Sequence, residues 1–186
     1  MLLRAIAILC FAGAAAAAEE VSVEASRRDG AIEVRAHALV DAAFETVWGT
    51  LTDYDRLPGF IPGMKASRVV ARNGNVSVVE QLGEARFLFF SFPIEVTVQS
   101  TARPPDAIDI RALKGSFRRL DGGYRLRQLP AGVIELVWIG LLEPDFAMPP
   151  LLGEVLMRST IEDQFLGMVR EIERREALRR AGAPRN

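Results

Sequence analysis

Apolar residues in the last part of the chain recur at the spacing of an α-helix. The stretch runs from residue 149 to about residue 180, opens with two prolines and carries Glu and Arg on its other face. Its apolar positions are Leu151, Leu152, Val155, Leu156, Ile161, Phe165, Met168, Val169 and Ile172. The pattern predicts one long amphipathic helix of about 40 Å, whose apolar face must be covered by the rest of the chain. We expect its charged end, residues 170–186, to be solvated and frayed.

The middle of the chain alternates apolar and polar positions with a period of two, which is typical of half-buried strands. Residues 21–40 give two such runs around a turn at Arg28-Asp29-Gly30, and residues 66–85 give two more around Asn73-Gly74-Asn75. Further strand patterns, separated by Pro and Gly turns, continue to residue 142. The sequence therefore predicts a curved antiparallel sheet closed by the terminal helix, and function depends on whether a cavity lies between them.

Two short helical segments are predicted between the first hairpin and the later strands. Residues 42–51 carry an apolar stripe, and Asp41 is suited to cap their first turn. Asp53 is suited to cap a second, shorter turn. Proline-glycine pairs then forbid regular structure over residues 58–64, and we expect this apolar loop to cover the mouth of a cavity.

One run does not fit a sheet with a single buried face. Residues 86–93 are apolar on both faces. We favour a bend of the strand, or cover from the helices, because Ser91 and Pro93 interrupt the run. The alternative is an outside apolar partner, such as a membrane or another protein, in contact with residues 87–92.

The composition limits the classes of protein. The 186 residues are 49% apolar and 25% charged with a formal net charge of -1, which suits one globular domain with its own core. Arg and Glu alternate rather than cluster by sign, so no basic surface for nucleic acid is predicted. A single histidine, His37, and a single cysteine, Cys10, exclude the usual His/Cys metal sites, and we predict neither a metal nor a cofactor.

The first residues have the features of a secretory signal peptide. Arg4 gives a basic start, residues 5–15 form an apolar core, and Ala16-Ala17-Ala18 supplies the small residues that a signal peptidase accepts. We place the cut after Ala18 and expect a periplasmic or secreted protein. The alternative is a leader that is kept as a membrane anchor.

Cleavage after Ala18 would divide the chain into three segments. Residues 1–18 are then the signal peptide, residues 19–180 a single domain and residues 181–186 a disordered tail. Lipidation of Cys10 is not expected, because a leucine precedes it where lipoprotein processing needs a small residue. The mature chain would contain no cysteine, so disulfides would play no part in its stability.

No strong catalytic motif is present: the sequence lacks a phosphate-binding glycine loop, a nucleophile elbow and a cysteine nucleophile. Glu80 is the best acid/base candidate, because the apolar residues two positions away on either side share its strand face, where burial would raise its pKa. Alternatively, Glu80 pairs with an arginine such as Arg118 or Arg119, or a bulge turns it outward. Gln81 would lie on the other face, away from such a site.

Two further residues invite a functional interpretation that we do not favour. His37 lies on the polar face of its predicted strand, so we expect a solvent-facing or hydrogen-bonded residue rather than a catalytic one. Trp48 belongs to the apolar stripe of residues 42–51 and is expected mainly in the core.

The order of elements and several short segments resemble the helix-grip fold of the START-like superfamily. The segments are Ala43-Phe44-Glu45-Thr46-Val47-Trp48, Leu51-Thr52-Asp53-Tyr54-Asp55-Arg56-Leu57-Pro58, Phe60-Ile61-Pro62-Gly63-Met64, and Gly115-Ser116-Phe117-Arg118 with Asp121-Gly122. They are similar to the polyketide cyclase/dehydrase and coenzyme Q-binding (Coq10-like) branch of the SRPBCC group, over nearly all of the mature chain. The resemblance implies an α+β fold: a curved antiparallel β-sheet wrapped around a long C-terminal α-helix, with two short helices after the first strands.

The resemblance also implies a deep apolar pocket between the sheet and the long helix. In this sequence its ligand-binding wall would come from Trp48, Phe60, Ile61, Met64, Phe87, Phe89, Phe117, Trp138, Leu152, Leu156, Phe165 and Met168. Such a wall suits an apolar ligand with few polar groups. The same fold serves lipid carriers, cyclases and hormone receptors, so the resemblance assigns no activity by itself.

We therefore predict an exported binding protein for a lipid or another hydrophobic small molecule, acting as carrier, chaperone or sensor. The leader favours this function, because cyclases and quinone chaperones of this group usually work inside cells or organelles. One alternative is a cyclase- or dehydratase-type enzyme that uses Glu80, or a cavity Arg or Tyr, to move protons; another is a protein-interaction module that uses residues 87–92. The expected partners are the hydrophobic ligand and, transiently, a membrane, with no nucleic acid.

Overall fold

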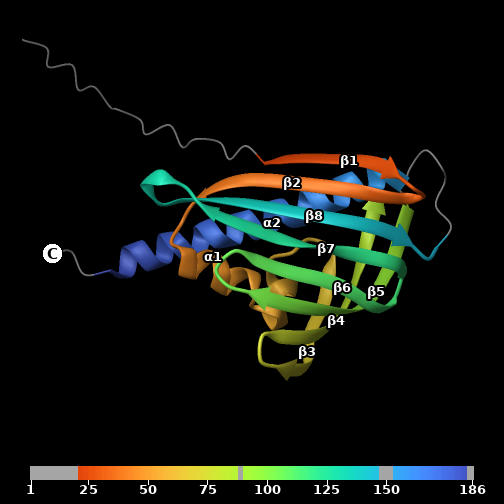
Figure 1. Cartoon of the computed structure of the whole chain (residues 1–186), viewed down its shortest axis with the longest axis horizontal. Coiled ribbons are helices and arrows are strands. Elements are labelled where there is room, and N and C mark those ends of the chain that lie inside the picture. The colour runs from red at the N-terminus through yellow and green to blue at the C-terminus, as the bar shows by residue number, and fades with distance from the viewer. Residues whose placement is uncertain (1–20, 88–89, 147–152, 184–186) are drawn as a thin grey trace, which may run out of the picture.

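The protein is built on one antiparallel sheet of eight strands, in the order β1-β2-β8-β7-β6-β5-β4-β3 (Figure 1). This computed structural model describes residues 21–87, 90–146 and 153–183. The strands are β1 (Ser22–Arg28), β2 (Ala31–Asp41), β3 (Met64–Asn73), β4 (Val76–Phe87), β5 (Phe90–Arg103), β6 (Ala107–Gly115), β7 (Phe117–Gln128) and β8 (Val133–Pro144). The helices are α1 (Phe44–Leu51) and α2 (Gly153–Gly182), with 3₁₀ turns η1 (Tyr54–Gly59) and η2 (Pro130–Gly132).

The first hairpin follows from its turn residues. Asp29 and Gly30 both have positive φ angles, 50° and 84°, as a tight two-residue hairpin turn requires. Strands β1 and β2 then pair with Val23 opposite Ala36, which puts the apolar residues of both strands on one face. Strand β2 pairs on its other side with β8, so the N-terminal hairpin is joined to the last strand of the chain.

Helix α2 runs along the inner face of the sheet and contacts β1, β2, β4 and α1 (Figure 1). Its buried apolar side chains are Leu156, Met157, Phe165, Met168, Val169 and Ile172. Val155, which we predicted on the apolar face, is 48% exposed. The predicted α+β fold, a curved antiparallel sheet closed by a long C-terminal helix, is confirmed; the predicted start of the helix at residues 149–152 lies outside the described residues.

The charged end of α2 is helical as far as Gly182, so the predicted fraying was wrong over the described residues, although most of the side chains there are exposed as expected. Two carboxylates there are buried, Glu171 and Glu176. Glu171 accepts hydrogen bonds from Arg174 and Arg175, and Glu176 accepts them from Arg179, Arg180 and Thr46 of α1. Most of these bonds join residues three or four positions apart on the helix, a spacing that the sequence shows, but the burial of the two carboxylates and the bond from Thr46 arise only in the folded chain.

The two predicted capping aspartates instead anchor this end of α2. Helix α1 begins without a side-chain cap, and the Asp41 carboxylate accepts a hydrogen bond of 2.8 Å from Arg180. Asp53 likewise makes no cap bond to η1 and accepts one of 2.9 Å from Arg175. The prediction of both caps was therefore wrong: these carboxylates join the ends of β2 and α1 to α2.

The apolar run of residues 86–93 is a hairpin rather than one strand. Strand β4 ends at Phe87 and β5 begins at Phe90, and these two residues face each other in the register. The chain thus reverses between Phe87 and Phe90, whereas Ser91 and Pro93, where we expected the bend, are paired residues of β5. Beyond the reversal, the ring of Phe92 stacks on that of Phe146 with centroids 5.3 Å apart.

Candidate functional site: a cavity between the sheet and the long helix

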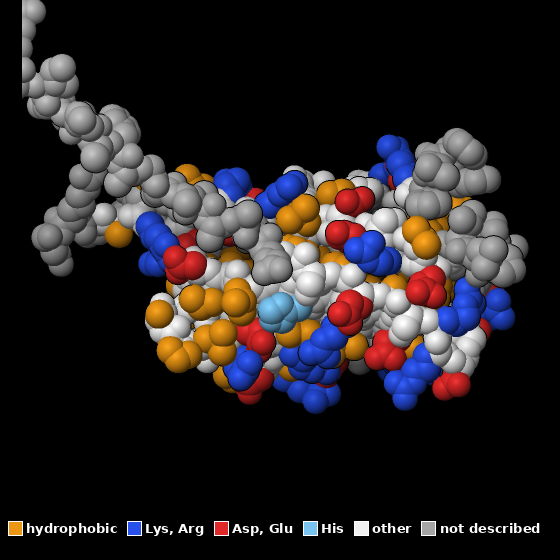
Figure 2. Space-filling view, turned by 90° about the horizontal axis from the view of Figure 1, so that it is seen from above, with side chains coloured by type: hydrophobic (Ala, Val, Ile, Leu, Met, Phe, Trp, Pro, Cys, Tyr) orange, Lys and Arg blue, Asp and Glu red, His pale blue; other side chains and the backbone are white. Residues whose placement is uncertain are grey.

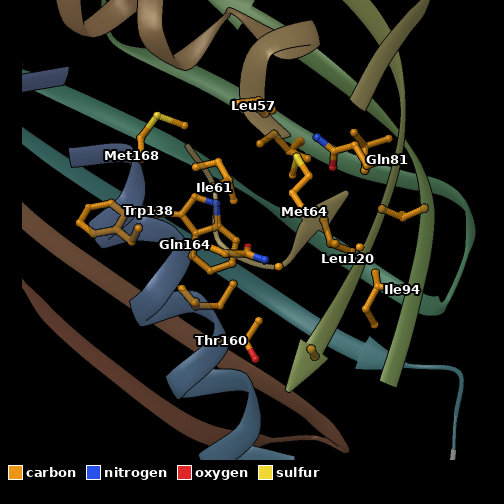
Figure 3. Close-up of a pocket in the computed structure, with 18 of the residues that line it drawn as sticks. Leu57, Ile61, Met64, Gln81, Ile94, Leu120, Trp138, Thr160, Gln164 and Met168 are labelled. Carbon is orange, nitrogen blue, oxygen red and sulfur yellow. The ribbon is translucent and has the colours of Figure 1, made fainter. Parts of the chain in front are cut away.

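A cavity of about 200 Å³ lies between the inner face of the sheet and the N-terminal half of α2. Strands β4 to β8 form one side of it, α2 the opposite side, and η1 with the loop after it the end (Figure 3). Most of the lining is apolar, including Leu57, Ile94, Leu120, Leu142 and Met168. The sequence did not show whether a cavity lies between the sheet and the terminal helix, and the structure shows that one does.

Trp138 and Tyr124 are neighbouring aromatic residues of the sheet-side wall. They face each other across β8 and β7, and Ala36 of β2 is the partner of Trp138 on the other side. The small Ala36 side chain leaves room for the indole. Gly140, two residues further along β8, also leaves room for the indole, because a Cβ there would lie 2.1 Å from the Trp138 ring atom Cη2. The indole thus occupies space that its neighbours leave free.

The loop after η1 closes one end of the cavity. Ile61 is buried and lines the wall, and its backbone N–H donates to the Leu57 carbonyl at 2.8 Å. A Cβ at Gly167 of α2 would lie 2.6 Å from both the Phe60 carbonyl oxygen and Pro62 Cδ. The loop backbone therefore rests directly on the helix, which agrees with the prediction that residues 58–64 cover the cavity.

The same loop is also fixed to β4. Gly63 has a φ of 78°, and its carbonyl accepts a hydrogen bond of 2.9 Å from the backbone N–H of Glu84. A Cβ on Gly83 would lie 2.6 Å from the Gly63 carbonyl oxygen. Glycine at both positions allows the two backbones to approach this closely.

Two tyrosines bring hydroxyl groups to the cavity wall. The Tyr54 hydroxyl forms a buried hydrogen bond of 2.8 Å with Ser100 Oγ of β5. Burial raises the pKa of Tyr54, although the bond to Ser100 acts in the opposite direction. Burial, and to a smaller extent the nearby Tyr54, also raises the pKa of Tyr124. Both phenols are therefore neutral near pH 7, so they can exchange hydrogen bonds with a ligand but are poor bases.

Glu80 does not reach the cavity. Its side chain is 42% exposed and accepts a hydrogen bond of 3.0 Å from Arg68 of the neighbouring strand β3. The opposite face of β4 is the inner one, since Ser77, Val79 and Ala85 are buried. The predicted placement of Glu80 on the buried face was wrong, and so was the expectation that Gln81 lies away from the site: Gln81 lines the cavity.

Half of the predicted ligand-binding residues lie at the cavity wall: Ile61, Met64, Phe117, Trp138, Phe165 and Met168. Three others are placed elsewhere. Trp48 stacks on Phe44 with centroids 5.6 Å apart, Phe60 lies under the guanidinium of Arg175 at 5.4 Å, and Leu156 is packed in the core. The side chain of Phe87, and all of Phe89 and Leu152, lie outside the described residues.

The polar part of the wall was missed from the sequence. It comprises Tyr54, Gln81, Ser100, Tyr124, Thr160 and Gln164. One signal for it was available: Met157, Ile161, Gln164 and Met168 follow one another at spacings of four, three and four residues, so Gln164 is a polar residue on the apolar stripe of α2.

Other candidate chemistry lies outside the cavity. His37 Nε2 is 3.3 Å from a carboxylate oxygen of Glu135 on the outer face of the sheet, in keeping with its interpretation as a hydrogen-bonded strand residue. Among the described residues, no group of three His, Cys, Asp or Glu side chains is placed to hold a metal ion. Of the helices in the described part of the chain, none combines the length and apolarity of a membrane crossing.

Comparison with protein families decides the relationship of this chain. The model of the family described as polyketide cyclase / dehydrase and lipid transport matches residues 40–168, which is more than half of the chain. The chain belongs to this family. The match does not distinguish the coenzyme Q-binding branch, which stays a prediction, and the chain matches no curated protein by sequence.

Solved structures show the fold of this polyketide cyclase and lipid transport family. A STAR-related lipid transfer protein from Xanthomonas axonopodis superposes with a TM-score of 0.70 at 16% identity, over 84% of this chain and 95% of that one. The Zhui aromatase/cyclase from Streptomyces sp. R1128 gives a TM-score of 0.68 at 18% identity, over 82% and 98% of the two chains. Human StAR-related lipid transfer protein 5 gives 0.65 at 8% identity, over 86% and 88%. At these identities the likeness establishes the START-like, helix-grip fold alone.

Proposed function

We propose that this member of the polyketide cyclase and lipid transport family is an exported protein that binds a hydrophobic small molecule, such as a lipid, in the cavity beneath α2. The observation that carries the proposal is the cavity itself, about 200 Å³ and mainly apolar in its lining. Moving apolar ligand surface from water into it is worth about 2.5 kcal/mol per 100 Å² before the cost of ordering is subtracted. The lipid transfer proteins among the structural neighbours agree with such a role.

Access for the ligand is proposed at the loop of residues 58–64. This loop carries Ile61 at the cavity wall, and its hydrogen bonds are to backbone atoms nearby. Its displacement would break the hydrogen bond between Gly63 and Glu84 and the pairing of Met64 at the start of β3, but would leave the rest of the sheet paired. In the proposed function, displacement of the loop admits the ligand and its return buries it.

Purification of the full chain from its own compartment tests the proposal. Native mass spectrometry should show a fraction of the protein with an added small mass, and solvent extraction should release an apolar molecule. Protein stripped of this molecule should take up an apolar ligand again, with quenching of the fluorescence of Trp138. If no apolar molecule is carried or can be loaded, the proposed binding function is wrong.

Export is the part of the proposal that rests on the sequence of residues 1–18. Cell fractionation should find the protein in the periplasm or the medium, and N-terminal sequencing of the purified protein should begin at Glu19. A protein that retains Met1 in a membrane fraction would instead support the alternative of an anchor.

Binding of nucleic acid is not part of the proposed function. On the face shown in Figure 2, Lys and Arg side chains are interspersed with Asp and Glu side chains. Many of the charged side chains of the described residues form ion pairs, such as Arg119 with Asp121 and Arg127 with Glu135. A nucleic acid needs a surface on which basic groups cluster, and this face does not provide one.

A second candidate function is catalysis of a cyclisation or dehydration, and the tyrosines at the wall are the observation that favours it. The aromatase/cyclase among the structural neighbours shares the fold. The neutral Tyr54 and Tyr124 could donate hydrogen bonds to a developing oxyanion, but neither is poised to accept a proton at neutral pH. Binding without chemistry is therefore the better-supported function. Conversion of a bound ligand that is lost in Tyr124→Phe, with binding retained, would establish the enzyme instead.

A further inference from the structure

The polar side chains at the described cavity wall are uncharged, with the single exception of Glu84. On the helix side they are Thr160 and Gln164, which lie one turn apart on α2 (Figure 3). Thr160 Oγ1 is buried and has no hydrogen-bond partner among the described residues. The Gln164 amide, which points from the helix toward the strands in Figure 3, also has no partner among them. Buried polar groups without partners are costly, so a ligand that supplies the missing bonds gains affinity.

The sheet side offers a matching amide, because the Gln81 side chain of β4 lines the cavity. Ser67 of β3 is the strand partner of Gln81, and its Oγ is buried without a partner among the described residues, but Ser67 is not part of the cavity lining. The amide can both donate and accept hydrogen bonds. Unpaired donors and acceptors are thus present on two opposite walls, the helix and the strands.

The hydroxyl groups of the tyrosines complete the polar set. Tyr54 is bonded to Ser100, while the described residues provide no hydrogen-bond partner for the Tyr124 hydroxyl. Burial raises the pKa of both tyrosines, with a smaller contribution from Tyr54 to that of Tyr124, so both keep their protons near pH 7. The pair therefore adds neutral hydrogen-bonding capacity and no charge.

Ionised groups are directed away from the cavity. Of the cavity-lining residues that the structure describes, Glu84 is the only one with an ionised side chain, and its neighbours Gly83 and Ala85 occupy the inner face of β4. Successive side chains of a strand point to opposite faces. The Glu84 carboxylate accordingly accepts a hydrogen bond of 2.8 Å from exposed Lys65, and this bond chiefly lowers the pKa of Glu84. A ligand carboxylate or phosphate would thus find no cationic partner at the described wall.

The size of the cavity limits the ligand further. A cavity of about 150 Å³ lined by apolar side chains holds one benzene ring. The present cavity, at about 200 Å³, suits a compact ligand of one or two rings. The two acyl chains of a phospholipid contain many more carbon atoms than one or two rings, so they would not fit in this cavity.

We infer that the cavity selects a compact, uncharged ring compound that carries hydrogen-bonding groups, and that it rejects carboxylates and phospholipids. This inference rests on the proposed binding function and refines its ligand class. Burying an anion here would cost its hydration without an ion pair in return, whereas a neutral amide or hydroxyl would satisfy groups that are now unpaired.

Matched probes test the inference on the purified full chain by calorimetry near neutral pH. Benzamide and benzoate differ in charge but hardly in shape, as do 2-naphthamide and 2-naphthoate, and naphthalene lacks the polar group. We expect the amide of the better-fitting pair to bind on the order of 100-fold more tightly than its carboxylate. We expect 2-naphthamide to bind about 3- to 10-fold more tightly than naphthalene for each hydrogen bond that it gains.

Variants of Gln164 test whether the cavity wall causes the preference for neutral ligands. Gln164→Leu should reduce the affinity for the amide about 3- to 10-fold and leave that for naphthalene unchanged or higher. Gln164→Lys should raise the affinity for the carboxylate above that for the amide. Glu80→Gln alters a polar group on the outer face of β4 and serves as the control that leaves all affinities unchanged. Circular dichroism and the urea midpoint verify that each variant is folded.

The outcomes separate the two proposals. If naphthalene and both amides fail to bind although the protein carries or takes up another apolar molecule, the inferred class of ring ligands is wrong; if no apolar molecule can be loaded at all, the proposed function is wrong. If an apolar or amide probe binds but the carboxylate binds as tightly as the amide, hydrophobic binding holds and the inferred preference for neutral ligands is wrong. If the amide gains nothing over naphthalene and Gln164→Leu has no effect, the hydrogen-bonding part of the inference is wrong. Uptake of a two-chain phospholipid from vesicles would overturn the size limit.

Discussion

Trp138 lines the cavity because residues around it have little or no side chain. Ala36 lies opposite it on β2, and Gly140 follows it on the same face of β8. Together with Tyr124 on the other side, these residues hold the indole against the sheet rather than across the hollow. At the scale of single residues, the volume available to a ligand therefore depends on positions that do not themselves contact it.

Gly140→Ala tests this dependence. The new Cβ would overlap the Trp138 ring, so the indole must shift toward the cavity, at a cost of about 1–3 kcal/mol in stability. In a Trp48→Phe background, where Trp138 is the only fluorophore of its kind, we expect a changed emission maximum and weaker binding of ring probes. Gly132→Ala would be a poor control, because its φ is 81°; Gly49→Ala, with nothing within 4 Å of the new Cβ, is the suitable one.

Single residues of β4 also show what the sequence could not predict, namely which face of this strand is buried. The face of β4 was assigned from Val76, Val78 and Leu82, yet the inner positions are Ser77, Val79 and Gln81. Both faces of the strand carry apolar residues, so alternation alone does not determine which face is buried. The identity of the polar cavity residues follows from that assignment, and only the folded structure supplies it.

At the scale of elements, α2 has two parts with different partners. Its first part, from Met157 to Met168, faces the cavity. Its last part is bonded to β2 through Arg180 and Asp41, and to α1 through Glu176 and the Thr46 hydroxyl. The apolar stripe made the helix predictable, and the turn residues made the hairpins predictable. The anchoring of the last part was not predictable, because Asp41 and Arg180 are far apart in sequence and their types are equally common on solvated surfaces.

Gly167 is the point where α2 meets the loop over the cavity. In Gly167→Ala the new Cβ would contact the Phe60 carbonyl and Pro62, so we expect the loop to be displaced. The variant should unfold at a lower urea concentration and release a bound ligand faster. Gly49→Ala is the matched control: it is also a helical glycine but has free space, and it should be stabilised by about 0.5–1 kcal/mol. Equal effects of the two changes would contradict the proposed contact.

At the scale of the whole molecule, the buried carboxylates of α2 couple stability to pH. Hydrogen bonds from Arg174 and then Arg175 outweigh burial and lower the pKa of Glu171 from 4.5 to about 2. Bonds from Arg179, Thr46 and Arg180 lower the pKa of Glu176 as well. Because the folded state holds both groups ionised, their contribution to stability is complete above about pH 4.5 and is lost as the pH falls toward 2.

Urea unfolding of Glu176→Gln measures this contribution. Glu176 is only 2% exposed and loses its charge-assisted bonds in the variant, so we expect a loss of about 2 kcal/mol at pH 7. The difference from the unaltered protein should shrink between pH 4.5 and pH 2. Glu173→Gln changes an exposed carboxylate on the same helix and should have almost no effect at any pH. A loss for Glu176→Gln that is independent of pH would argue against the ionised, paired state.

The pairing of β2 with β8 means that the sheet can be completed only late in synthesis of the chain. About a hundred residues separate the partners, for example Val34 and Gly140. Until the last strand has been made, the N-terminal hairpin has an open edge and no connection to strands β3 to β7. A nascent or truncated chain that stops before residue 133 thus consists of two unjoined groups of strands, and closure of the sheet awaits the final third of translation.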